Sequence, residues 1–76
     1  MIKELDTVVL NKNLPNLGLE AGDVGTVVLV HAGGAGFEVE FATLAGETLT
    51  VATLGGSAIR PIDRHEIAHV RRVAHG

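Results

Sequence analysis

At 76 residues the chain fits a single domain, near the lower limit for a protein that folds on one hydrophobic core. It has no cysteine, which excludes a disulfide framework and a thiolate-held metal, and its two aromatic residues leave the core to aliphatic side chains. The net charge of −3 is uneven: residues 1–59 carry two lysines against seven acids, and residues 60–76 carry four arginines against two acids. An acidic body repels phosphate backbones, which disfavours nucleic acid, and we expect the basic tail to fold back onto that body. The chain shows neither an apolar run of membrane length nor a signal peptide, so we expect a cytoplasmic protein that does not bind membranes.

The predicted elements are short strands separated by turns. In chain order, β-branched and apolar patterns predict strands at 7–10, 24–31, 37–41, 48–54 and 59–62. Gly25 lies inside the second strand and marks a bulge or a close backbone approach, either of which lets a short sheet curl. The pattern therefore predicts a mainly β fold, a small five-stranded SH3-like barrel over residues 1–62.

The last segment, 63–76, has a different pattern. Asp63 followed three residues later by Glu66 is typical of a capping box, and Ile67, Val70 and Ala74 would share one face of a helix. We expect a short C-terminal helix, with an extended tail or a final strand as the alternative.

The second predicted strand has more apolar residues than one buried face requires. Val27 and Leu29 fall on the face opposite Val28, so both faces are apolar in the middle of the strand. The next strand alternates cleanly and places Glu38 and Glu40 on its exposed face, either as solvated charges or opposite a basic partner. We predict that Val27, Leu29, Glu38 and Glu40 form a surface that binds a protein partner or a second copy of the chain.

One motif resembles a catalytic one. His65-Glu66-Ile67-Ala68-His69 matches the zinc-binding pattern His-Glu-x-x-His, and His75 stands where a third ligand would follow. However, Arg72 replaces the glycine that must break the helix before that ligand, and the motif ends at the C-terminus with no residues left to form a cleft. A zinc hydrolase is therefore the distant alternative. We retain His65 and His69 as a candidate metal-binding pair, and otherwise predict no catalytic residue, no enzymatic activity and no cofactor.

Four segments together resemble a family of small bacterial proteins that is classified as a domain of unknown function. They are Met1–Leu10, Leu14-Pro15, Gly22–Val28 and Phe37–Phe41. The resemblance covers nearly the whole chain and implies a small β-barrel without an established activity. It also implies a second small protein encoded beside it, as in a two-component, toxin–antitoxin-like pair.

A shorter similarity supports a different function. Gly22-Asp23-x-Gly25-x-Val27 is similar to the turn and strand of KOW modules, which are SH3-like barrels of ribosomal and transcription proteins. The alternative to protein binding is therefore nucleic-acid binding through four arginines of the tail: Arg60, Arg64, Arg71 and Arg72. The absence of Tyr and Trp, on which bases would stack, argues against it.

Overall fold

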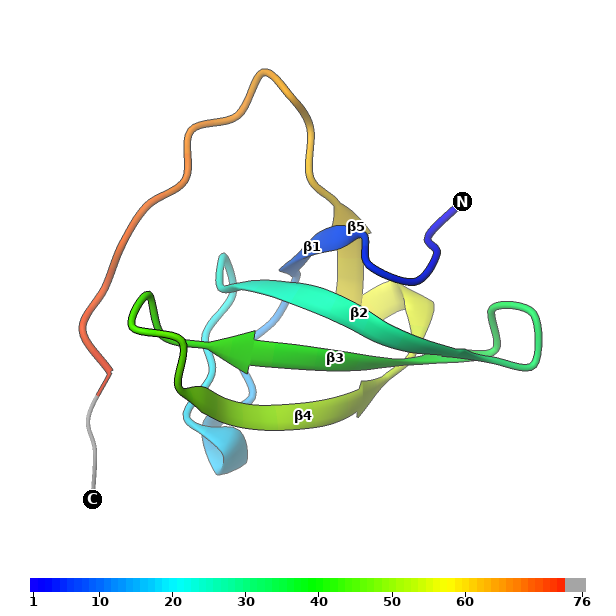
Figure 1. Cartoon of the computed structure of the whole chain (residues 1–76), viewed down its shortest axis with the longest axis horizontal. Coiled ribbons are helices and arrows are strands. Elements are labelled where there is room, and N and C mark those ends of the chain that lie inside the picture. Colours follow the sequence, from blue (N-terminus) through cyan, green and yellow to red (C-terminus); the bar gives the residue numbers. More distant parts are fainter. Residues whose placement is uncertain (74–76) are drawn as a thin grey trace.

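A computed structural model describes residues 1–73 and shows one antiparallel sheet (Figure 1). Its strands are β1 (Thr7–Leu10), β2 (Val24–His31), β3 (Gly36–Ala42), β4 (Thr48–Leu54) and β5 (Ile59–Pro61). Two short 3-10 helices, η1 (Pro15–Leu17) and η2 (Gly56–Ala58), lie in the connections. The spatial order is β4-β3-β2-β1-β5. The predicted mainly β fold with five strands is confirmed, but the sheet is not closed, because its edge strands β4 and β5 do not pair with each other.

The core lies on the concave face of the sheet and is aliphatic apart from two phenylalanines. Alternation along each strand turns every second side chain inward. The largest side chains with almost no exposed surface are Phe41, Leu10, Val8, Val27 and Val39. Leu19, from the long loop between β1 and β2, joins this cluster, so that loop is held by its own side chain. No polar side chain of the described residues is buried in the core.

Gly25 allows β2 to pass close to β3. A Cβ atom at this position would lie 2.6 Å from Val39 Cγ1 and 2.9 Å from the Glu40 carbonyl oxygen. Real Cβ atoms do not come this close to other heavy atoms, so only glycine fits here. The close backbone approach predicted from the sequence is confirmed.

A β-bulge further along β2 corrects the predicted partner surface. Val27 pairs with Val39, whereas Leu29 pairs with the next residue back along β3, Glu38, so Val28 is the extra residue. The bulge breaks the alternation, and Val27 and Leu29 point to opposite faces. Val27 is completely buried and Leu29 is 44% exposed. Val27 therefore belongs to the core and is removed from the predicted surface.

The tail beyond β5 is extended, not helical. The first turn of the predicted helix forms, since Asp63 N–H donates to Glu66 Oε1 at 2.7 Å and Glu66 N–H donates to the Asp63 carbonyl at 3.0 Å. No helix continues through the described residues 67–73. Short helices gain their stability from a buried apolar face, and here Ile67 and Val70 are 86% and 82% exposed. The predicted helix is wrong and the extended alternative is correct. Its final residues, 74–76, lie outside the described part of the chain.

Candidate functional site

The face of the sheet that points away from the core carries apolar side chains in contact with solvent. Val28 and Leu29 of β2 are 42% and 44% exposed, and Val51 of β4 is 50% exposed. Between them, Glu38 and Glu40 of β3 pair with Leu29 on one side and Val51 on the other. These five residues form what we call the outer face. Apolar side chains gathered on an exposed face are typical of a protein interface.

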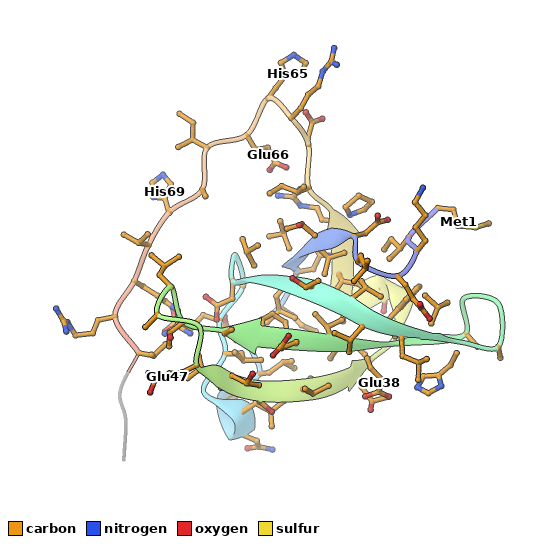
Figure 2. The ribbon with its side chains drawn as sticks, in the orientation of Figure 1. Met1, Glu38, Glu47, His65, Glu66 and His69 are labelled. Carbon is orange, nitrogen blue, oxygen red and sulfur yellow. The ribbon has the colours of Figure 1, made fainter. Side chains whose placement is uncertain are left out.

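The two carboxylates of the outer face are held by hydroxyl groups of the neighbouring strand. Thr53 Oγ1 lies 2.9 and 2.8 Å from the two Glu38 oxygens, and His31 Nε2 lies 2.6 Å from Glu38 Oε2. Thr48 donates in the same way to Glu40. The hydrogen bond to His31, followed by that from Thr53, lowers the pKa of Glu38 below its ordinary value. Glu38, labelled on the sheet in Figure 2, is therefore ionised at neutral pH and fixed in position.

The tail is fastened to the body by an arginine near its end. Arg71 donates two hydrogen bonds to Asp23, from Nε to Oδ1 at 2.8 Å and from Nη2 to Oδ2 at 2.6 Å. It also donates to the Gly18 carbonyl at 3.0 Å, and its Nη1 lies 3.7 Å from Glu20 Oε2. The hydrogen bond from Arg71 lowers the pKa of Asp23. The expectation that the basic tail folds back onto the acidic body is confirmed, and we call this contact the clasp.

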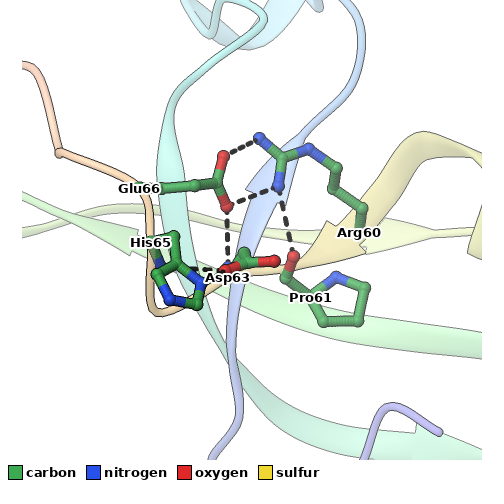
Figure 3. A network of polar contacts seen from close by, with 5 residues as sticks. All are labelled: Arg60, Pro61, Asp63, His65 and Glu66. Carbon is green, nitrogen blue, oxygen red and sulfur yellow. Dashed lines mark hydrogen bonds and ion pairs between the residues drawn. The ribbon is translucent and has the colours of Figure 1, made fainter.

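A second ion pair fixes the base of the tail (Figure 3). The two terminal nitrogens of Arg60 donate to the two oxygens of Glu66 at 2.8 and 2.6 Å. This bidentate pair, together with the hydrogen bond from Asp63 N–H, lowers the pKa of Glu66 to about 2. The planar fork of the guanidinium matches the carboxylate, so Arg60 of β5 and Glu66 hold the start of the tail against the sheet.

These ion pairs use half of the arginines that the nucleic-acid alternative requires. Arg60 and Arg71 are engaged with carboxylates of the same chain, whereas Arg64 and Arg72 are exposed. A phosphate would have to displace Glu66 and Asp23 to reach the first two. The four arginines therefore do not form one open basic patch.

The histidines of the zinc motif are not arranged as the motif requires. Without a helix, His65 and His69 do not share a helical face, and both point away from the sheet in Figure 2. Glu66, which would act as the general base, is bound to Arg60 instead. The structure brings together no group of three or more metal-ligating side chains among residues 1–73. His75, which stands at the third ligand position of the longer motif, lies outside the described residues.

Sequence reasoning missed Val28, Val51 and the partners of the tail arginines. Val51 lies in a strand with no charged residue, and this absence of charge is the sequence signal that could have indicated an exposed apolar surface there. Asp23 was interpreted as a turn residue, and nothing local links it to Arg71, which is 48 positions away.

Comparison with known protein families identifies the family of this chain. The model of a domain of unknown function, DUF4926, matches residues 4–61. The chain belongs to this family. The match runs from just before β1 to the end of β5, so this DUF4926 domain includes the outer face and leaves the extended tail outside it. Neither the curated proteins nor the solved structures gave a match. Within residues 1–73 there is no helix with the length and apolar character needed to cross a membrane.

Proposed function

We propose that this DUF4926 domain is a non-enzymatic binding module that docks a partner protein on its outer face. The observation that carries the proposal is the exposure of Val28, Leu29 and Val51 around two immobilised carboxylates. Val28 and Leu29 are neighbours on β2, and exposed apolar side chains that gather on one face mark interaction sites. Carboxylates held by Thr48 and Thr53 lose little side-chain entropy on binding, so they suit a partner whose basic groups face them.

The second small protein implied by the family resemblance is the first partner to test. A binding module of this size buries few residues of its own, so part of its apolar surface is free for a partner of similar size. Co-expression with the product of the neighbouring gene, followed by affinity purification, would test the pairing directly.

The decisive experiment compares lysine substitutions at two exposed leucines. Leu29→Lys places a charge on the outer face, whereas Leu44→Lys changes an exposed residue of the turn between β3 and β4 that is not part of that face. We expect the wild type and Leu44→Lys to retain the co-purified protein and Leu29→Lys to lose it by at least tenfold. Equal retention by all three chains would refute the outer face as the binding surface.

A further inference from the structure

The two edges of the open sheet differ in how far they are protected from pairing with another strand. The β5 edge is three residues long, contains Pro61, which has no N–H to donate, and carries Arg60, which is bound to the tail. The β4 edge is seven residues long, with the sequence TLTVATL, and contains neither a charge nor a proline. Proteins usually guard sheet edges with charges, prolines or short strands, because a bare edge pairs with other chains. Here one edge is guarded and the other is bare.

The bare part of β4 is regular and self-complementary. A bulge between Thr48 and Thr50 interrupts the pairing near the start of β4, but Thr50–Leu54 pairs residue by residue with β3. The side of this stretch away from β3 has no strand partner among the described residues. A second copy related by a two-fold axis perpendicular to the sheet extends the sheet across the β4 edge. Side chains on the face away from the core then lie opposite side chains on the same face of the other copy. Val51 of one copy therefore lies opposite either Val51 or Thr53 of the other copy. No acidic residue lies opposite another, because β4 has none.

We propose that this DUF4926 domain forms a dimer by antiparallel pairing of β4 with β4 of a second copy. Pairing satisfies the free backbone groups of both edges and brings the half-exposed Val51 side chains of the two copies together. A second copy fits better than an unrelated strand because the stretch is uncharged and offers nothing to select a charged partner. This inference does not rest on the proposed function, because it concerns the free backbone groups along the β4 edge. Val51 belongs to both surfaces, whereas Leu29 belongs to the outer face alone.

The test measures the mass of the untagged chain and two lysine variants by light scattering and sedimentation over a range of concentrations. Edge pairing buries less than the roughly 1,600 Å² of a typical stable complex, so we expect a dimer that dissociates on dilution at micromolar concentration. The wild type should reach twice its single-chain mass of 7.9 kDa. Val51→Lys, which sets lysines close together across the pair, should raise the dissociation constant by at least tenfold. Leu29→Lys, on β2, should leave it unchanged.

A cysteine variant adds a measurement that does not depend on reduced affinity. The chain has no native cysteine, so a single introduced thiol reports on one contact. Under mild oxidation, Val51→Cys alone, or mixed with Thr53→Cys, should give a disulfide-linked dimer, because directly opposed residues have Cβ atoms about 5 Å apart. Leu29→Cys, exposed to a similar degree, should not. The inference is overturned by a single-chain mass at every concentration, by dissociation of the dimer with Leu29→Lys, or by a dimer that Val51→Lys leaves intact.

Discussion

The backbone of β2 passes so close to β3 at Gly25 that even a methyl group has no space. The nearest atoms include a carbonyl oxygen of β3 and the ring of Phe41, which is 2% exposed, so neither neighbour can move cheaply. We expect Gly25→Ala to lower the free energy of unfolding by about 1–3 kcal/mol, the usual cost of overpacking.

Gly55 provides the matched control for that substitution. It has a negative φ, and no atom lies within 4 Å of a Cβ built there. Gly55→Ala should be neutral or stabilising by about 0.4–1 kcal/mol, because alanine reduces the entropy of the unfolded chain. Urea unfolding of both variants would check the pair, and equal stabilities would contradict the close approach at Gly25.

Val27 and Leu29 are two positions apart and have opposite environments. Val27→Ala removes two methyl groups from the core and should cost about 2 kcal/mol. Leu29→Ala should change stability by less than about 0.5 kcal/mol, because the side chain is half in solvent. Chemical denaturation would separate the two, and a loss of stability in Leu29→Ala comparable to that of Val27→Ala would place Leu29 in the core.

At the scale of elements, the tail is held by charged pairs that titrate in acid. The pKa of Glu66 falls from 4.5 to about 2 beside Arg60, and that of Asp23 is lowered by Arg71. A carboxylate with a lowered pKa contributes stability above its unfolded value and loses it as the pH falls through its folded value. We therefore expect the base of the tail to detach between about pH 4.5 and pH 2.

Backbone ¹⁵N relaxation of residues 63–73 would follow this detachment. Order parameters should fall across that range, and Asp23→Asn should lower them at neutral pH by removing the charge that Arg71 contacts. Glu4→Gln, in the segment before β1, serves as the control, because none of the ion pairs that hold the tail involves Glu4. A tail that is equally ordered in the wild type and in Asp23→Asn would show that the clasp does not hold it.

The elements also show where sequence reasoning succeeds. Val, Ile and Thr in short alternating runs predicted all five strands, because burial of one face imposes a period of two. The helix failed for a physical reason. Glu66 binds back to Asp63 N–H as in a capping box, but the segment buries neither Ile67 nor Val70. The β2 bulge could not be predicted, since it depends on the register with β3 and not on local residue types.

In the candidate site, too, local residue patterns were predictable and tertiary contacts were not. Leu29, Glu38 and Glu40 were predicted to share a surface, and the structure places them on one face. Val27 was assigned to that surface in error because strict alternation was assumed through the bulge. The charge asymmetry predicted that the tail folds back, but pairing of Arg71 with Asp23 is a tertiary contact that no spacing rule gives.

At the scale of the whole molecule, the core is complete without the tail. Among residues 1–73 the last buried residue is Ile59, and the ion pairs that hold the tail are at least partly exposed. Removing residues 63–76 should therefore lower the free energy of unfolding by no more than about 1 kcal/mol, because exposed ion pairs contribute little. Thermal unfolding of the shortened chain would check this, and failure to fold would show that the tail is part of the stable domain.

The guarded β5 edge limits how many chains can join through their sheet edges. Strands that pair at both edges can add copies without end, which is how fibres form. In this sheet, Pro61 and the bound Arg60 close one side, so pairing through β4 uses up the reactive edge of each chain. Any assembly by edge pairing is thus self-limiting, and it ends at two chains however high the concentration rises.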